Sequence, residues 1–296
     1  MASMQFQELY RTLKAQPDRA ALPVEELREL GRRKAAGLPV PDDVTCRPVD
    51  AGGVPGEWIS APGAAEGRAL LYLHGGGYYH GSIATVRELC GRISRAAGVR
   101  VLAIDYRLAP EQPFPAALDD ARAAWRRLRA QGLAPQGLGV GGDSAGGGLT
   151  VALLVALREA GEPLPAAGVC LSPWVDLTHS GDSMRELASH DPSLSKAYLD
   201  RFAHLYLDGA DARDPRASPL FADLAGLPPL LIQVGGREIL RDDGLRLAER
   251  ASAADVPVEL DLWEEMVHVW QNNGPELPEG QEAVERIGRF LRTRLA

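Results

Sequence analysis

The sequence predicts an α/β fold in which a mostly parallel sheet is covered by helices on both faces. Apolar, strand-like runs alternate with helical segments from residue 44 to the last helix. Several of these runs are apolar almost throughout, as expected for parallel strands that are buried on both faces. The 296 residues, 45% of them hydrophobic and 24% charged, are enough to bury a sizeable core.

The elements follow from residue spacing. Residues 1–36 are expected to be helical and amphipathic, because Phe6, Leu9, Tyr10 and Leu13 recur at helical spacing. A Pro/Gly-rich link at 37–43 comes next. The expected strands are 44–50, 56–61, 69–75, 99–106, 137–143, 166–172, 229–236 and 256–264. The expected helices are 85–98, 117–132, the one that follows Ser144, 242–254 and 279–294.

One segment, residues 176–226, interrupts this alternation. It contains "KAYLDRFAHLYL" (196–207), a predicted helix with aromatic residues on one face. An insertion of this length at the strand ends predicts a lid that pairs with the N-terminal helices over a pocket. A surface excursion is the alternative. We therefore expect a single domain over 1–296, with a cap formed by about 1–40 and about 178–226.

Composition and charge exclude several classes of protein. The net charge is 32 − 40 = −8, which gives no basic surface for nucleic acid. The three cysteines are few, odd in number and without a C-x-x-C pair, so neither a disulfide framework nor a cysteine zinc site is indicated. The charged N-terminus is unlike a secretory signal, and no run approaches the roughly 20 apolar residues of a membrane span. These features predict a cytoplasmic protein with no nucleic-acid or membrane partner.

The segment "GDSAG" (142–146) predicts a nucleophilic serine. It matches G-x-S-x-G and lies between an expected strand and an expected helix, which is the context that this motif requires. Ser144 would then occupy a strained turn, and a Cβ at 142 or 146 would clash with neighbouring turns. A glycine-rich turn that serves only close packing is the alternative interpretation.

The same region also fits G-x-G-x-x-G at 137–142, the spacing of a dinucleotide-binding loop. In such a loop the glycines follow the strand and open the helix. Here Gly137 and Gly139 lie before or within the strand, and no acidic residue ends a second strand about 20 residues later. No nucleotide cofactor, and no other cofactor or metal, is therefore expected.

A second glycine cluster, "HGGG" (74–77), closes the strand at 69–73. The backbone N–H groups of Gly76 and Gly77, together with that of Ala145, are expected to form an oxyanion hole. Each such donor contributes on the order of 3 kcal/mol to stabilisation of a tetrahedral intermediate. His74 is expected to brace this loop by hydrogen bonding, with a role as catalytic base as the alternative.

Together these segments resemble the α/β-hydrolase superfamily, specifically the bacterial hormone-sensitive-lipase-like (family IV) esterases. The motifs are "HGGGYYHGS" (74–82), "DYRLAPEQPFPAALDD" (105–120), "GGDSAGG" (141–147), "LSPWVDLT" (171–178) and "MVHVW" (266–270). They span about two-thirds of the chain in the order of the family. The resemblance implies an eight-stranded, mostly parallel sheet, a helical cap, and hydrolysis of short acyl esters without a cofactor.

The base and the acid of a triad are expected in the order Ser…Asp/Glu…His. Of the six histidines, only His268 follows the last expected strand, so it is the expected base. The family's D-x-L-x-D pattern aligns with "EILRD", which implies that Glu238 is the acid in place of the usual aspartate. Asp242 is the alternative acid, although its position suits a helix cap better. Glu265, where many relatives carry glycine, is a second departure from the family's pattern.

The remaining expectations concern support and substrate binding. Arg107 and Glu111 are expected to form a buried pair that supports the oxyanion loop. Asp143 is expected to bond to nearby backbone. The expected substrate-binding residues are Tyr78, Asp143, Trp174, Tyr198, Phe202 and Leu205.

The sequence therefore predicts a serine carboxylesterase that acts on a small-molecule ester through Ser144, His268 and Glu238. An amidase or acyltransferase using the same triad is one alternative, because fold alone does not separate these reactions. A non-catalytic small-molecule receptor is another, and the presence of His268 argues against it. The resemblance also implies that the chain forms a homodimer.

Overall fold

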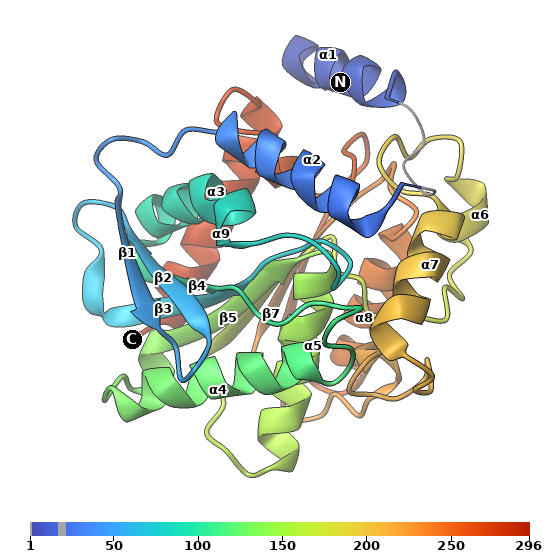
Figure 1. Cartoon of the computed structure of the whole chain (residues 1–296). Helices are drawn as coiled ribbons and strands as arrows, with labels where there is room; N and C mark the ends of the chain where they lie inside the picture. The colour runs from blue at the N-terminus through green and yellow to red at the C-terminus, as the bar shows by residue number, and fades with distance from the viewer. Residues whose placement is uncertain (1, 17–21) are drawn as a thin grey trace.

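The central sheet has the predicted, mostly parallel architecture. The computed structural model describes residues 2–16 and 22–296, and within them eight strands lie in the order β1-β2-β4-β3-β5-β6-β7-β8. The β1–β2 and β2–β4 pairs are antiparallel, and every pair from β4 to β8 is parallel (Figure 1). The strands are β1 (Thr45–Asp50), β2 (Pro55–Ser60), β3 (Ala65–Leu73), β4 (Val99–Ile104), β5 (Leu138–Asp143), β6 (Ala167–Leu171), β7 (Leu230–Gly235) and β8 (Val258–Trp263).

Helices cover both faces of this sheet. α3 and α9 pack on one face, where they bury an apolar cluster with β3, β4 and β6, and α4, α5 and α8 cover the other face. The helices are α1 (Met4–Lys14), α2 (Val24–Ala36), α3 (Ile83–Ala97), α4 (Ala116–Ala130), α5 (Ala145–Glu159), α6 (Ser183–Glu186), α7 (Lys196–Leu207), α8 (Arg241–Ala253) and α9 (Pro278–Arg294). The inner strands β5, β6 and β7 are therefore buried on both sides, as their apolar sequences predict, whereas the edge strand β8 is partly exposed.

Helix α3 shows how local chemistry sets an element's limits. Ser82 and Thr85 form a reciprocal capping box at its N-terminus. At the other end Gly98 adopts a left-handed conformation (φ 68°), and its N–H bonds to the carbonyl of Ser94. A glycine suits this position because it has no Cβ to clash. The helix thus ends at the glycine that the sequence analysis placed there.

The N-terminal region forms two helices, and the expected helical residues 17–21 lie outside the described part of the chain. The Phe6 side chain of α1 is buried in an apolar cluster that includes Met266 and Trp270. α2 packs beside α3. Arg201 of α7 donates a hydrogen bond to the carbonyl of Leu22, so α7 is joined to the segment that precedes α2.

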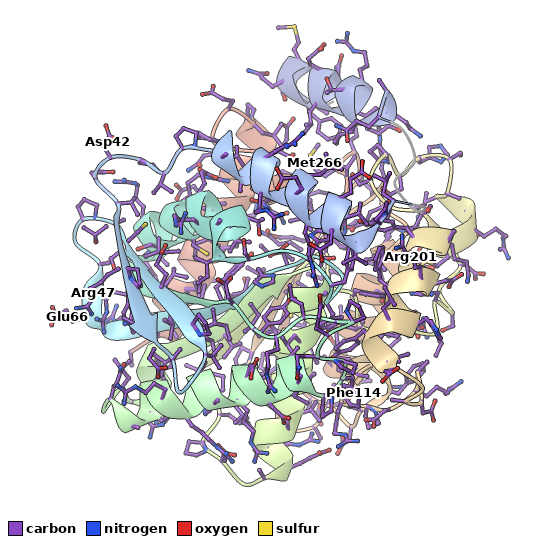
Figure 2. All side chains as sticks on the ribbon, in the orientation of Figure 1. Asp42, Arg47, Glu66, Phe114, Arg201 and Met266 are labelled. Carbon is purple, nitrogen blue, oxygen red and sulfur yellow. The ribbon has the colours of Figure 1, made fainter. Side chains whose placement is uncertain are left out.

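The inserted helix α7 lies away from the antiparallel edge of the sheet (Figure 1). Figure 2 shows Arg201 on the opposite side of the molecule from Arg47 and Glu66, which lie at the β1 end. The insertion at 176–226 contains α6, α7 and a short 3₁₀ helix, Pro219–Phe221. Within the described ranges, no helix combines the length and apolar character needed to cross a membrane.

Candidate active site

Ser144 lies on a strained turn between β5 and α5. Its backbone has φ 54° and ψ −121°, a conformation that residues other than glycine rarely adopt. A Cβ at Gly142 would lie 2.4 Å from the carbonyl oxygens of Gly146 and Leu73, and one at Gly146 would lie 1.9 Å from that of Leu73. The predicted requirement for glycine at both positions is therefore confirmed.

The imidazole of His268 faces the serine. It lies in the loop after β8, and its Nε2 is 2.9 Å from Ser144 Oγ. Its Nδ1 is 2.5 Å from Glu238 Oε2. Since a carboxylate only accepts, Nδ1 carries the proton in the neutral ring and Nε2 is left to accept from the serine hydroxyl. The structure thus brings together the three residues that the sequence analysis assigned to a triad.

The carboxylate of Glu238 is fully buried, and both of its oxygens have partners. Oε1 accepts hydrogen bonds from the backbone N–H of Gly235 (2.6 Å) and from Ser172 Oγ (2.8 Å). Ser172 Oγ in turn accepts the N–H of Val269, at 3.0 Å. Ser172 therefore connects the turn that carries the acid with the loop that carries His268. The sequence analysis missed this residue, although its position at the end of β6 was a signal.

The environment of His268 raises its pKa. Burial of the ring is the largest influence and lowers the pKa, because it disfavours the charged form. The negative charge and hydrogen bond of Glu238, with smaller contributions from Asp191 and Asp143, outweigh it. The protonated form of the His268 ring is thereby stabilised.

Asp242, the alternative acid, and the neighbouring Asp243 form hydrogen bonds with backbone N–H groups of other segments. Asp242 Oδ2 accepts the N–H of Ser183 at the start of α6, so Asp242 caps a helix from outside that helix. Asp243 Oδ2 accepts the backbone N–H groups of Val175 and Asp176, both at 2.9 Å. The carboxylate that reaches His268 is that of Glu238, as the sequence alignment implied.

The glycine loop after β3 lies beside the serine turn. β3 and β5 are adjacent, with Leu73 in register with Gly142. Gly76 (φ 120°) and Gly77 (φ 60°) adopt conformations that favour glycine. Within residues 2–16 and 22–296, the N–H groups of Gly76, Gly77 and Ala145 donate to no other protein group. These three donors are therefore available to an oxyanion that forms at Ser144.

His74 and Asp143 brace this loop. His74 Nδ1 donates to the carbonyl of Gly75 (2.8 Å), and the ring stacks on Tyr106 with centroids 4.1 Å apart. Asp143 Oδ1 accepts from the N–H of Gly75 (3.1 Å) and from Tyr72 Oη (3.0 Å). The predicted bracing role of His74 and the predicted backbone bond of Asp143 are both confirmed. Burial raises the pKa of Asp143.

The predicted Arg107–Glu111 pair is wrong. Arg107 instead pairs with Asp120, at 2.7 Å, and its side chain is 48% exposed. Glu111 accepts two hydrogen bonds from Arg28 of α2, at 2.7 and 2.8 Å. The reason lies in the tertiary structure. Helix α2 packs over the loop, and its Arg28 brings a guanidinium to Glu111 from outside the local turn. The hydrogen bonds from Arg28 lower the pKa of Glu111 to about 2.

Arg28 links α2 to the oxyanion loop. Its Nε donates to the carbonyl of Tyr79 (2.9 Å), and its Nη2 donates to that of Ala109 (3.1 Å). One planar guanidinium thus binds two backbone carbonyls and the Glu111 carboxylate. The support that the sequence analysis assigned to Arg107 comes from Arg28.

We expect Arg28→Met to lower kcat about tenfold, because small displacements of preorganised donors weaken transition-state stabilisation. Arg32→Met is the matched control. Arg32 lies one turn further along α2, is 59% exposed and pairs with Glu29, so its loss should leave kcat unchanged. Steady-state rates on p-nitrophenyl butyrate at matched protein stability measure the difference, and equal rates for the two variants would contradict this role.

Two of the expected substrate-binding residues lie deep in the core. The ring of Tyr78 stacks on Tyr206 with centroids 3.7 Å apart, and its side chain is 1% exposed. Trp174 has no exposed surface, and its Nε1 donates to His179 Nε2 at 3.2 Å. Their contacts are with other protein side chains, among them Tyr206 of the cap helix α7.

Three others are carried by α7 itself. Phe202 is buried and stacks on Tyr79 of the oxyanion loop. The hydroxyl of Tyr198 is hydrogen bonded to that of Tyr79. Tyr198 and Leu205 are partly exposed. α7 therefore packs directly on the loop that bears Gly76 and Gly77.

The chain is similar to known proteins both in sequence and in structure. Residues 70–272 match the model of a family described as alpha/beta hydrolase fold. An acetyl-hydrolase of Streptomyces hygroscopicus is 50% identical over 257 residues, 87% of this chain and 84% of the relative. An esterase of Acinetobacter venetianus is 38% identical over 248 residues, 83% and 82% of the two chains. The crystal structure of an esterase from the bacterial hormone-sensitive lipase family matches with a TM-score of 0.96 at 49% identity, and all of both chains is covered. Among the described residues, no group of three or more His, Cys, Asp or Glu side chains could hold a metal ion.

Proposed function

The chain belongs to the α/β-hydrolase fold family, in its bacterial hormone-sensitive lipase group, and is a carboxylesterase; we propose that Ser144, His268 and Glu238 are its catalytic triad. The observation that carries this proposal is the continuous chain of contacts from Ser144 Oγ to His268 and on to Glu238, at 2.9 and 2.5 Å. A nucleophile, a base and an orienting carboxylate in contact are what acyl transfer requires.

In the proposed mechanism Ser144 Oγ attacks the ester carbonyl while His268 Nε2 takes the hydroxyl proton. The carbonyl oxygen becomes an alkoxide, which the N–H groups of Gly76, Gly77 and Ala145 stabilise. The tetrahedral intermediate collapses as the bond to the leaving alkoxide breaks and the imidazolium protonates that oxygen, so that the alcohol departs and an acyl-enzyme remains. Water then attacks this acyl-enzyme with His268 again as the base, which releases the acid and restores the serine.

We propose a preference for short acyl chains, bound beneath a cap formed by α1, α2 and residues 178–226. The name of the acetyl-hydrolase relative supports a small acyl group. The close packing of α7 on the oxyanion loop through Phe202 supports a confined site. Tyr78, Asp143, Trp174, Tyr198 and Leu205, with Phe202, remain the proposed residues around the substrate.

The proposal is tested with p-nitrophenyl esters of increasing acyl length. We expect kcat/KM to be highest for acetate to butyrate and to fall by about tenfold or more by dodecanoate, because longer chains exceed a confined pocket. If deacylation is slow, rapid mixing should release one p-nitrophenol per protein molecule before steady turnover begins. Mass spectrometry should then find the acyl group on the peptide that contains Ser144. Steady hydrolysis with the label on another residue would refute the triad, and undiminished rates on long chains would refute the acyl preference.

We further propose a cytoplasmic location and a homodimer. The location is supported by the free cysteines of the described chain, of which Cys90 and Cys170 are buried and Cys46 is exposed. The dimer is supported by β8, a sheet edge on which Leu260 and Leu262 are 42% and 37% exposed. Light scattering of the purified protein decides the oligomeric state, and a monomer at micromolar concentration would argue against the dimer.

A further inference from the structure

The turn that carries Glu238 is held by residues of the inserted segment. The N–H of Ile239, the next residue after the acid, donates to Asp191 Oδ2 at 2.9 Å. The carbonyl of the same residue accepts from Ser183 Oγ at 2.7 Å. Both backbone polar groups of Ile239 are therefore bound by side chains that lie more than 45 residues away in the sequence.

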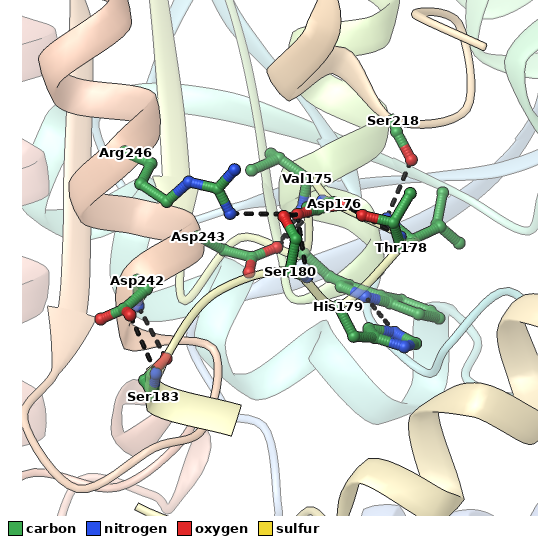
Figure 3. A network of polar contacts seen from close by, with 12 residues as sticks. Val175, Asp176, Thr178, His179, Ser180, Ser183, Ser218, Asp242, Asp243 and Arg246 are labelled. Carbon is green, nitrogen blue, oxygen red and sulfur yellow. Dashed lines mark hydrogen bonds and ion pairs between the residues drawn. The ribbon is translucent and has the colours of Figure 1, made fainter. Parts of the chain in front are cut away.

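Further contacts anchor this segment to α8, directly after the turn. Ser183 and Asp242 exchange two hydrogen bonds, one from the N–H of Ser183 to the carboxylate and one from the N–H of Asp242 to Ser183 Oγ. Arg246 binds the buried Asp176, at 3.0 Å, and Figure 3 shows both connections between α8 and the inserted segment. The segment and the start of α8 thus form one hydrogen-bonded unit, from which Asp191 reaches the residue beside the acid.

Asp191 has the contacts of an ionised carboxylate. Its Oδ1 accepts the N–H groups of Ser193 (2.8 Å) and Leu194 (3.0 Å), and its Oδ2 accepts that of Ile239. All of these partners are donors, and the side chain is 6% exposed. Oδ1 satisfies the local turn at 191–194, and Oδ2 joins that turn to the residue that follows Glu238.

The charge of Asp191 also acts on His268. The carboxylates of Glu238, Asp191 and Asp143, from three different parts of the chain, are the groups that raise the pKa of His268 against the effect of burial. Within the described residues no lysine or arginine forms an ion pair with Asp191. No basic side chain among them therefore neutralises its charge. Burial raises the pKa of Asp191, and the charge of His268 and the three backbone N–H donors oppose this effect and favour the ionised form.

We propose that Asp191 is a positioning residue of the triad: it fixes the turn that carries Glu238 and adds a second negative charge that stabilises the imidazolium of His268. This inference rests on the proposed function. It assigns to the inserted segment a part in the chemistry of the acid and the base, in addition to covering the substrate.

The test is Asp191→Asn, which keeps the size of the side chain and removes its charge. We expect kcat on p-nitrophenyl butyrate to fall about tenfold, with KM within about twofold, because a misplaced acid weakens the transition state more than it weakens binding. The acid limb of the kcat/KM profile should move to lower pH, because loss of a negative charge lowers the pKa of His268. NMR titration of the His268 ring should show the same downward shift without any turnover.

Two further variants separate the effect of the Asp191 charge from the effect of the hydrogen bonds that hold Ile239. Asp200→Asn is the matched control, since Asp200 is a cap carboxylate, 49% exposed, that binds His179 and Lys196; it should retain wild-type kcat and the wild-type titration of His268. Ser183→Ala removes the other bond to Ile239 without a change of charge, so it should lower kcat and leave the titration unchanged.

Wild-type kcat together with a wild-type titration of His268 in Asp191→Asn would overturn the proposal and leave Asp191 as a turn former. If that variant does not fold, Asp191→Ser retains an acceptor for the local turn and loses both the charge and the reach to Ile239, and the same two measurements decide. The NMR titration also distinguishes this inference from the proposed function, because it gives a result even if the wild-type protein proves to hydrolyse no ester.

Discussion

Replacing Ser144 with alanine is expected to lower kcat by about 10⁴- to 10⁶-fold, the largest effect of any single substitution in this protein. Without Oγ no acyl-enzyme forms, and only water attack assisted by the oxyanion donors and by His268 remains. The fold should persist, because Ser144 caps no N–H with its side chain and the glycines that permit the turn are unchanged.

The measurement is the rate of p-nitrophenol release from p-nitrophenyl butyrate, together with thermal unfolding. Ser172→Ala is an informative comparison, because it removes a buried hydroxyl that binds Glu238 and keeps the nucleophile. That variant should retain far more activity than Ser144→Ala. A Ser144→Ala protein that unfolds at the wild-type temperature and keeps more than about a hundredth of the wild-type kcat would refute the assigned nucleophile.

The second large effect is expected for Glu238→Gln, with kcat reduced by roughly 10³- to 10⁴-fold. The amide can donate to His268 Nδ1, which favours the tautomer that carries its proton on Nε2 and cannot accept from Ser144. The amide also no longer stabilises the imidazolium. The side chain is fully buried and hydrogen bonded at both oxygens, so no solvent replaces the lost charge.

The residual activity of Glu238→Gln should have a changed pH dependence. Neutral His268 is the active form, so activity is lost as pH falls through its pKa, which in the wild-type protein lies above that of an ordinary histidine. The charge of Glu238 opposes the effect of burial on that pKa, and its removal should move the acid limb to lower pH. An unchanged acid limb would show that another carboxylate sets the pKa.

Asp242→Asn provides the control for this substitution. It is the same chemical change four residues further on, in the first turn of α8, and its amide oxygen can still accept the N–H of Ser183. We expect it to retain most of the wild-type kcat. A reversed result, with activity kept in Glu238→Gln and lost in Asp242→Asn, would assign the acid to Asp242.

Much of this architecture could be predicted from local sequence. Apolar runs such as 69–73 specify buried strands because of their own composition, and the spacing around Ser144 specifies a turn that no other residue than glycine permits at 142 and 146. The family's D-x-L-x-D pattern indicated Glu238, and the position after the last strand indicated His268. Parallel strands present their carboxyl ends on the same side, so residues that follow them were expected to lie near Ser144.

The partners of the charged side chains could not be predicted in this way. Arg107 and Glu111 are close in sequence and were expected to pair, yet Glu111 binds Arg28, which lies 83 residues away. Asp191 looks like an ordinary turn residue in the sequence, and only the packed structure shows its second oxygen on Ile239.

The sequence by itself therefore determined the strands, most of the helices and the turn at Ser144, and its resemblance to the family indicated the proposed acid and base. The local elements could be predicted because strand burial and glycine sterics are properties of short segments. The tertiary structure alone decided which side chains hold the reactive groups in place. Arg28 and Asp191 acquire their contacts through the docking of α2 and the inserted segment onto the strand ends, and such long-range geometry leaves no pattern in any one stretch of sequence.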